Sequence, residues 1–361
     1  MKLFIPGPTQ VHPEVLAEMS RPAIGHRTEE CADLWREARQ GLAWLMQTQS
    51  EIIMLTAPAS AMMEAALRNF VKERSLHLVN GAFSKRWYEI GAANGTQAEK
   101  LEVPMGEAVT APMLEQLLKS EADAGRCFDI VTVVHNETST GTVTPIADLA
   151  TVLKAYPQTL LCVDTVSSMA GAPIPVDEWG IDFCLFGLQK CLALPAGMAI
   201  ASVSARALER AAEVPHRGWF LDLLKLSAKN VKEQSPTTPS TAHLFALVKQ
   251  LQRIREEGLE NRWQRHVDMA RQVQIWATEK GWHMFPAEGF RSTTVSCIAR
   301  GSGPDFVPAL DALKASGILV SNGYGDLKGK TFRIGHMGDH QMSDIDDLLQ
   351  RFDQALLTAA E

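Results

Sequence analysis

The sequence lacks several features that define whole classes of protein. Its six cysteines include no C-x-x-C pair and several lie in apolar runs such as 160–163, which indicates reduced, buried thiols rather than disulfides. Basic residues are in the minority, 35 against 42 acidic residues, and the net charge of -7 offers no attraction for nucleic acid or an anionic membrane surface. We find no apolar stretch long enough to span a membrane, no signal peptide and no organelle address, so we expect a cytoplasmic protein.

Common catalytic and nucleotide-binding motifs are also missing. No G-x-G-x-x-G follows a strand-like run, and neither H-E-x-x-H nor G-x-S-x-G occurs. The ten histidines do not cluster as metal ligands; His336 and His340 are four apart, but the glycines around them argue against a continuous helix. We therefore predict no metal site and no dinucleotide fold.

What is present is a chain of 361 residues, 46% hydrophobic, in which short apolar runs alternate with helical patterns. Continuous apolar runs indicate strands buried on both faces, and their alternation with helices predicts a mainly parallel sheet with helices on both sides. The strand-like runs are 52–55, 76–79, 130–134, 160–163, 183–186 and 198–203.

The pattern changes after about residue 242. Apolar stripes at helical spacing cover 244–254 and 263–276, and short strands follow. Ser343, with Asp346 three residues later, resembles the capping box of a final helix. We therefore predict a large domain over 1–254 and a smaller α+β domain over 255–361.

Lys190 stands out because it is the one charge in the fifteen residues 183–197. Its stem could lie on apolar surface while its ammonium reaches water, or its amine could be desolvated, with a depressed pKa suited to imine formation. Asp164 ends another strand-like run, at the sheet edge where ligands bind, either as a loop cap or as the partner of a cationic ring nitrogen.

The segment 56–60 leads directly into a helical pattern. A helix N-terminus binds phosphate through its free N–H groups and dipole, although an ordinary N-cap would have a similar sequence.

A series of short sequence motifs extends over essentially the whole chain, and their order and spacing are specific. They are Pro6-Gly7-Pro8-Thr9, Gly25-His26-Arg27, Asn80-Gly81-Ala82-Phe83, His135 to Gly141, Val163 to Ser168, Gln189-Lys190, Thr237-Thr238-Pro239 and Phe332 to Gly335.

In this order the motifs resemble the class V, fold-type-I aminotransferases of the alanine–glyoxylate and serine–pyruvate type. The resemblance implies pyridoxal 5'-phosphate (PLP) as cofactor. It also implies a large PLP domain with a mainly parallel seven-stranded sheet between helices, followed by a small C-terminal α+β domain.

The resemblance assigns cofactor contacts to individual residues. Lys190 should carry the internal aldimine and then shuttle a proton, and Asp164 should pair with the pyridine nitrogen. Phe83 should lie against the ring, unless it only packs in the core. Thr138 should bind near the phenolic oxygen, and Gln189 should approach the phosphate.

Two departures from the family pattern affect the phosphate contacts. Relatives commonly have Gly-Ser-Gly-Thr where this chain has Ala57 to Ser60, so Ala59 would bind through its amide and Ser60 through its hydroxyl, whereas Pro58 has no N–H to offer. Ser235 also replaces a tyrosine found in some relatives. The resemblance places Thr238 on the phosphate of the neighbouring subunit's cofactor, which implies a homodimer with shared active sites.

The resemblance also assigns contacts with the substrate to four residues: Gly7, His26, Arg27 and Arg333. Arg333 matches the arginine that binds the substrate α-carboxylate as a bidentate partner, with a surface ion pair as its alternative. His26-Arg27 also resembles the pair that phosphoserine-specific relatives use, although Arg27 could simply pair with Glu29 or Glu30.

The resemblance therefore implies ping-pong transamination between a small amino acid, of the alanine or serine class, and a 2-oxo acid such as glyoxylate or pyruvate. Phosphoserine transamination is one alternative. A cysteine desulfurase is disfavoured because its nucleophile needs a mobile polar loop, whereas Cys297 lies in a strand-like run. A third alternative is a protein that binds PLP without catalysing a reaction.

Overall fold

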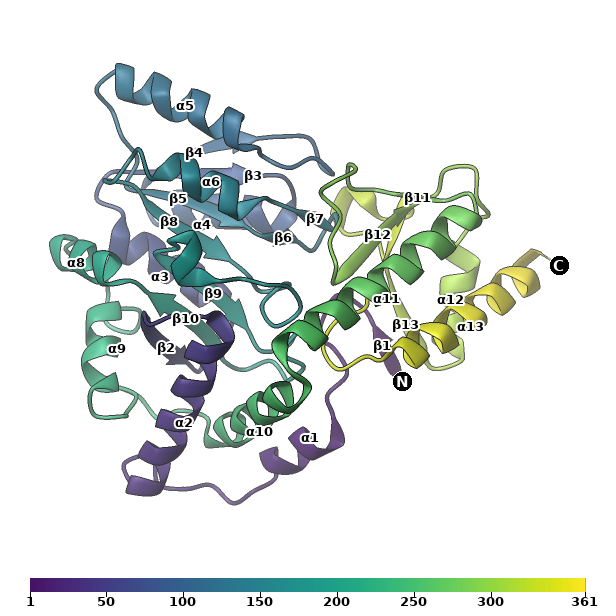
Figure 1. The fold of residues 1–361 in the computed structure, drawn as a ribbon, viewed down its shortest axis with the longest axis horizontal. Helices are drawn as coiled ribbons and strands as arrows, with labels where there is room; N and C mark the ends of the chain where they lie inside the picture. The colour runs from purple at the N-terminus through teal and green to yellow at the C-terminus, as the bar shows by residue number, and fades with distance from the viewer. Residues whose placement is uncertain (361) are drawn as a thin grey trace.

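The computed structural model describes residues 1–360 and contains a large and a smaller β-sheet, each covered by helices (Figure 1). The large sheet confirms the prediction of a mainly parallel, seven-stranded α/β fold, with β10 as its antiparallel member. Its strands, in spatial order, are β2 (Glu51–Leu55), β10 (Ala199–Val203), β9 (Phe183–Gly187), β8 (Leu160–Asp164), β5 (Ile130–Val134), β3 (Arg74–Val79) and β4 (Gln97–Glu102).

Alternate residues of the strands bury themselves in two different helical layers. In β2, Ile52 and Met54 belong to one core cluster while Ile53 and Leu55 belong to the other, which explains the unbroken apolar run. The first layer contains α2 (Glu29–Met46), α5 (Ala111–Asp123), α6 (Ile146–Leu153) and α10 (Thr241–Glu257). The second contains α3 (Ser60–Phe70), α4 (Ala82–Ala93), α8 (Ala205–Glu213) and α9 (Leu223–Asn230).

The C-terminal sheet has its own aromatic core, in which Trp276, Trp282 and Phe332 pack together. Its strand order is β1 (Lys2–Phe4), β13 (Ile318–Asn322), β14 (Thr331–Gly335), β12 (Val295–Ala299) and β11 (His283–Met284). Its helices are α11 (Leu259–Glu279), α12 (Val307–Ala315) and α13 (Met342–Ala360). The remaining elements are α1 (Pro13–Met19), α7 (Val176–Trp179), the hairpin β6 (Asn136–Glu137) and β7 (Thr142–Val143), and a short 3-10 turn at Gly325–Leu327.

The N-terminus joins the C-terminal sheet, because β1 pairs in parallel with β13; in Figure 1 the purple start of the chain lies beside the yellow-green strands.

The domain boundary between residues 254 and 255 remains a prediction. The predicted capping box is wrong: α13 begins at Met342, and Asp344 rather than Asp346 accepts a hydrogen bond from the backbone N–H of Gln341 at 3.0 Å. Within residues 1–360, none of the helices combines the length and apolar character needed to cross a membrane.

Candidate active site

A recess of about 210 Å³ opens at the carboxyl edge of the large sheet. Several parallel strands end there, and the segments that follow them supply the walls, as expected for a ligand site in an open α/β sheet. The lining includes every residue predicted to contact the cofactor within one chain: Ala59, Ser60, Phe83, Thr138, Asp164, Gln189 and Lys190. The family resemblance thus named residues that the structure brings together in one recess, although the role of each residue remains a proposal.

Lys190 follows β9 and is held on both sides by the N-terminal segment. Thr9 donates from Oγ1 to the Lys190 carbonyl oxygen at 3.0 Å, and the Lys190 ammonium donates to the carbonyl oxygen of Pro6. Gly7, with φ +100, lies so close that a Cβ there would collide with the Lys190 side chain. Burial lowers the pKa of Lys190 to about 8, which increases the neutral, nucleophilic fraction of the amine.

Asp164 is the last residue of β8, the strand adjacent to β9, so its carboxylate and Lys190 meet at the same edge. Its Oδ1 accepts from the backbone N–H of Val166 at 2.7 Å. Burial raises the pKa of Asp164 to about 7, and the attraction of Lys190 and Arg86 offsets only part of the cost of ionising it. A cationic ring nitrogen would supply the missing counter-charge, so the recess fits the chemistry of PLP.

The phosphate end of the recess is the N-terminus of α3. Ala59 is its N-cap residue and no side chain caps the helix. The Ala61 N–H already donates to the Pro58 carbonyl oxygen at 2.9 Å, so the N–H groups of Ala59 and Ser60 are the ones available to an anion. Pro58 and Ser60 line the recess beside them, and the Gln189 side chain lies next to Gly187 and Ala59. The altered sequence therefore still presents amide and hydroxyl donors where the phosphate is expected.

A buried carboxylate that the sequence interpretation passed over, Glu137, caps α4 and so fixes Phe83. It accepts hydrogen bonds from the backbone N–H of Phe83 at 3.1 Å and of Ser84 at 2.9 Å, and from the Ser139 hydroxyl at 2.6 Å. Glu137 lies in the His135 to Gly141 motif, so the signal was present in the sequence.

Arg86 also lines the recess and was missed. Its guanidinium carbon lies 4.8 Å from the centre of the Phe83 ring, and its Nη2 donates to the Tyr324 hydroxyl at 3.4 Å. No carboxylate in the described part of the chain forms an ion pair with it. Its only signal was its position one helical turn after Phe83.

Arg333, in the middle of β14, is 7% exposed; it is not one of the residues that line the recess, but it contacts the recess wall at Thr138. Its Nη1 donates to the Thr138 carbonyl oxygen at 3.0 Å and its Nη2 to that of Asn322 at 3.3 Å, while its buried Nε has no hydrogen-bond partner. The alternative of a surface ion pair is therefore wrong. A guanidinium with an unsatisfied buried N–H is suited to a carboxylate ligand.

His26, Arg27 and Thr238 do not line this recess. Thr238 is exposed, and Arg27 donates from Nη1 to the Ser235 carbonyl oxygen at 2.8 Å instead of pairing with Glu29 or Glu30. The predicted segments around Arg27 and Thr238 are thus joined at Ser235, and none of these three predicted residues contributes to the lining of its own chain's recess.

The rival chemistries find little support. Cys297 is fully buried in β12, and burial raises the pKa of its thiol to about 11, so it is not a ready nucleophile. Among the described residues, no cluster of histidine, cysteine and carboxylate side chains has the arrangement of a metal site.

Comparison with known proteins gives a consistent result. The class-V aminotransferase family profile matches residues 3–324. An uncharacterized aminotransferase of Methanocaldococcus jannaschii is 37% identical over 93% of this chain and 87% of its own length. L-aspartate–glyoxylate aminotransferase of Paracoccus denitrificans is 31% identical over 93% of this chain and 86% of its own. The crystal structure of alanine–glyoxylate aminotransferase from a Nostoc species superimposes with a TM-score of 0.91 at 29% identity, covering 98% of this chain and 94% of that one.

The match covers the sheet, the recess and most of the C-terminal domain. The chain therefore belongs to the class-V aminotransferases, enzymes that use PLP as cofactor.

Proposed function

We propose that this aminotransferase transfers the amino group of a small amino acid, of the alanine or serine class, to a 2-oxo acid such as glyoxylate or pyruvate. The observation that carries the proposal is the convergence of Lys190 and Asp164 on one recess, with the Arg333 guanidinium, whose buried Nε has no hydrogen-bond partner, bonded to the carbonyl oxygen of Thr138 in the recess wall. Two relatives of this chain have names that include glyoxylate as a substrate, which favours that acceptor.

In the proposed mechanism PLP, when bound, supplies an electron sink that stabilises negative charge at the substrate Cα. Lys190 removes and returns the Cα proton through Nζ, since its lowered pKa of about 8 allows it to act as a base near neutral pH. Asp164 in its ionised form holds the protonated ring nitrogen. Arg333 binds the α-carboxylate and so orients the Cα–H bond toward Lys190.

We further propose that two copies of the chain share their active sites. Thr238 and Arg27 lie in adjoining segments outside their own recess, which is the arrangement needed for them to reach a partner's. Trp219 and Val231, which are 62% and 85% exposed, precede Thr238 in the chain and offer apolar surface for such an interface.

A second donor class is favoured by Arg86. A guanidinium that lines the recess without an acidic partner is suited to a second anionic group, as on aspartate or phosphoserine. Arg86 and Arg333 both contact Tyr324, Arg86 at its hydroxyl and Arg333 over its ring at 5.5 Å from the ring centre, so one dianionic donor would have to reach both guanidinium groups.

The test is a half-reaction screen of the PLP-loaded protein with alanine, serine, aspartate and phosphoserine. Loss of the lysine-bound PLP absorption with alanine or serine, and its return on addition of glyoxylate or pyruvate, supports the small-substrate proposal. A response to aspartate or phosphoserine alone would transfer the assignment to a dianionic donor. No response to any amino acid would indicate a non-catalytic PLP binder.

A further inference from the structure

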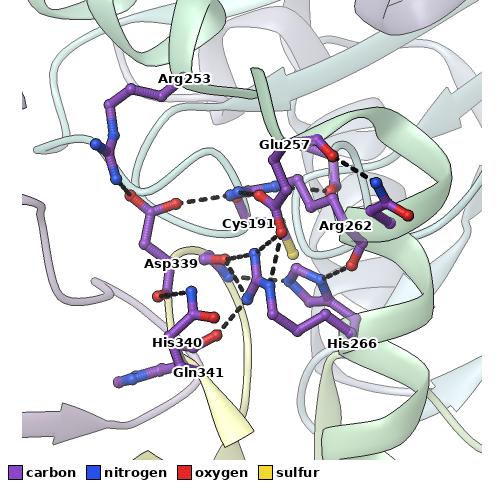
Figure 2. A network of polar contacts seen from close by, with 12 residues as sticks. Cys191, Arg253, Glu257, Arg262, His266, Asp339, His340 and Gln341 are labelled. Carbon is purple, nitrogen blue, oxygen red and sulfur yellow. Dashed lines mark hydrogen bonds and ion pairs between the residues drawn. The ribbon is translucent and has the colours of Figure 1, made fainter. Parts of the chain in front are cut away.

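Arg262, in the first turn of α11, is a buried arginine that the reaction outlined above does not use. Its side chain is 2% exposed, and nearly all its N–H groups are occupied (Figure 2). Nε donates to the Ala170 carbonyl oxygen at 3.2 Å, Nη2 to the Cys191 carbonyl oxygen at 2.8 Å and to Asp339 Oδ1 at 3.0 Å, and Nη1 to Glu257 Oε2 at 2.7 Å.

Three of these contacts fall on segments that carry a proposed active-site residue. Cys191 directly follows Lys190, Ala170 lies in the loop after Asp164, and Asp339 lies in the loop that follows the strand of Arg333. A guanidinium is planar and rigid, so one group that bonds all three segments fixes their relative positions.

The loops that Arg262 contacts have backbone conformations that need support. Ala170 has φ 71 and Ala193 has φ 54, in the left-handed region that side chains other than glycine rarely adopt unless the surroundings hold them there. A Cβ on Gly171 would lie 2.7 Å from Cys191 Sγ, so the two loops are also in direct contact. Arg262 therefore donates to the carbonyl oxygens of Ala170 and Cys191 beside the point where their two loops are in contact.

The backbone of Arg262 is anchored as well. His266 donates from Nδ1 to the Arg262 carbonyl oxygen at 2.7 Å, and its Nε2 accepts from the Gly338 N–H at 3.1 Å. Burial holds the pKa of His266 well below its usual range, which keeps the ring neutral and consistent with that single tautomer. The start of α11 is therefore fixed to the loop after β14.

We propose that Arg262 is a positioning residue that holds the main chain beside Lys190 and Asp164 in register with the strand of Arg333. The inference rests on the proposed roles of those residues. Arg265 provides a matched control in the same network: it shares Glu257 with Arg262 and donates to the carbonyl oxygens of Gly338 and His340, but it contacts neither Ala170 nor Cys191.

The experiment compares Arg262→Gln, Arg262→Lys and Arg265→Gln as PLP-loaded proteins. Each is measured for kcat and KM, thermal unfolding, and visible circular dichroism per bound PLP, which reports how the cofactor is oriented. Removal of Arg262 leaves Glu257 paired with Arg265, and leaves Asp339 with Gln250 at 3.0 Å and Arg253 at 3.8 Å, so we expect Arg262→Gln to fold.

For Arg262→Gln we expect kcat to fall by about 10- to 100-fold with a smaller change in KM, because a displacement of about 1 Å at a reacting group costs about 10²-fold. The dichroism per bound PLP should change as well, and Arg262→Lys should recover part of both. Arg265→Gln should lower the unfolding temperature while leaving kcat and dichroism near the wild-type values.

Equal effects of the Arg262 and Arg265 variants on kcat and dichroism would overturn the proposal, as would loss of folding in both Arg262 variants while Arg265→Gln folds. Wild-type protein that shows no lysine-bound PLP signal would instead overturn the proposed function, so the two failures are distinguishable.

Discussion

The guanidinium of Arg333 donates from Nη1 to the carbonyl oxygen of Thr138 at 3.0 Å, which joins the C-terminal sheet to the turn between β6 and β7. Because Asn322 accepts from Nη2 as well, the arginine is fixed in one orientation before any substrate arrives. Its buried Nε remains unsatisfied, and a bound carboxylate would remove that cost.

Replacement of Arg333 tests this arrangement. Arg333→Lys should lower kcat/KM by about 10- to 100-fold, because a charge-assisted hydrogen bond contributes about 1.5–3 kcal/mol and each 1.4 kcal/mol is a factor of ten. Steady-state kinetics with the preferred donor measures it. Arg300→Gln is the control, since Arg300 is exposed and its nearest carboxylate, Asp305, is 3.8 Å away. Equal kinetics for both variants would remove Arg333 from the substrate site.

Asp164 should make the stability of the PLP-free protein depend on pH. Its pKa is about 7 when folded, against an ordinary 3.8, so the folded state retains this proton more tightly. The contribution of this bound proton to the free energy of unfolding is complete below about pH 4 and is lost as the pH rises toward 7. In Asp164→Asn it is absent, so the stability of the variant relative to wild type should rise over this range by on the order of 4 kcal/mol, at about 1.4 kcal/mol per pKa unit. Urea unfolding at several pH values measures the difference, and a pH-independent difference would contradict it.

Thr238 tests whether active sites are shared. Thr238→Ala should weaken PLP binding by about 10- to 100-fold if its hydroxyl bonds a phosphate, by the energies of charge-assisted hydrogen bonds. Mixing this variant with Lys190→Ala should then restore tight PLP binding and activity to about a quarter of the wild-type level, since half the randomly formed dimers contain one intact site. No recovery above the separate variants would count against sharing.

Cys297 should be dispensable for chemistry. The raised pKa of its thiol and its full burial predict that Cys297→Ala keeps kcat within about twofold, with only the modest stability loss of a small core truncation. The wild-type protein should release no sulfide from cysteine. Sulfide release that depends on Cys297 would instead favour a desulfurase.

Much of the fold followed from apolar runs, because strands buried on both faces leave a strong pattern. The exception is β4, whose sequence Gln97 to Glu102 is mostly polar: an edge strand is exposed, and backbone pairing with β3 rather than side-chain burial defines it. The start of the last helix, α13, was predicted wrongly. Asp344 and Asp346 are equally plausible capping residues in the sequence, and only the position of the first turn of α13 decides between them.

Lys190, Asp164 and the segment 56–60 were predictable because each lies next to a strand end or a helix start. Phe83, Thr138 and Gln189 followed only from the family resemblance. Arg86 and Arg262 were not predictable, since a charged residue on a helix normally faces solvent. The buried face of α11 includes Arg262 and His266 as well as Ala270, Val273 and Trp276 from the predicted apolar stripe, whereas Trp263 and Val267 are only partly buried. Only tertiary contacts with distant loops make those polar side chains part of the interior.

The most direct test of the central claim is the absorption spectrum of the PLP-loaded protein during one half-reaction. Wild-type protein should lose the band of lysine-bound PLP when alanine or serine is added and regain it with glyoxylate or pyruvate. Lys190→Ala should bind PLP without that band and show no turnover. An unchanged wild-type spectrum with every donor, or normal transamination by Lys190→Ala, would contradict the account.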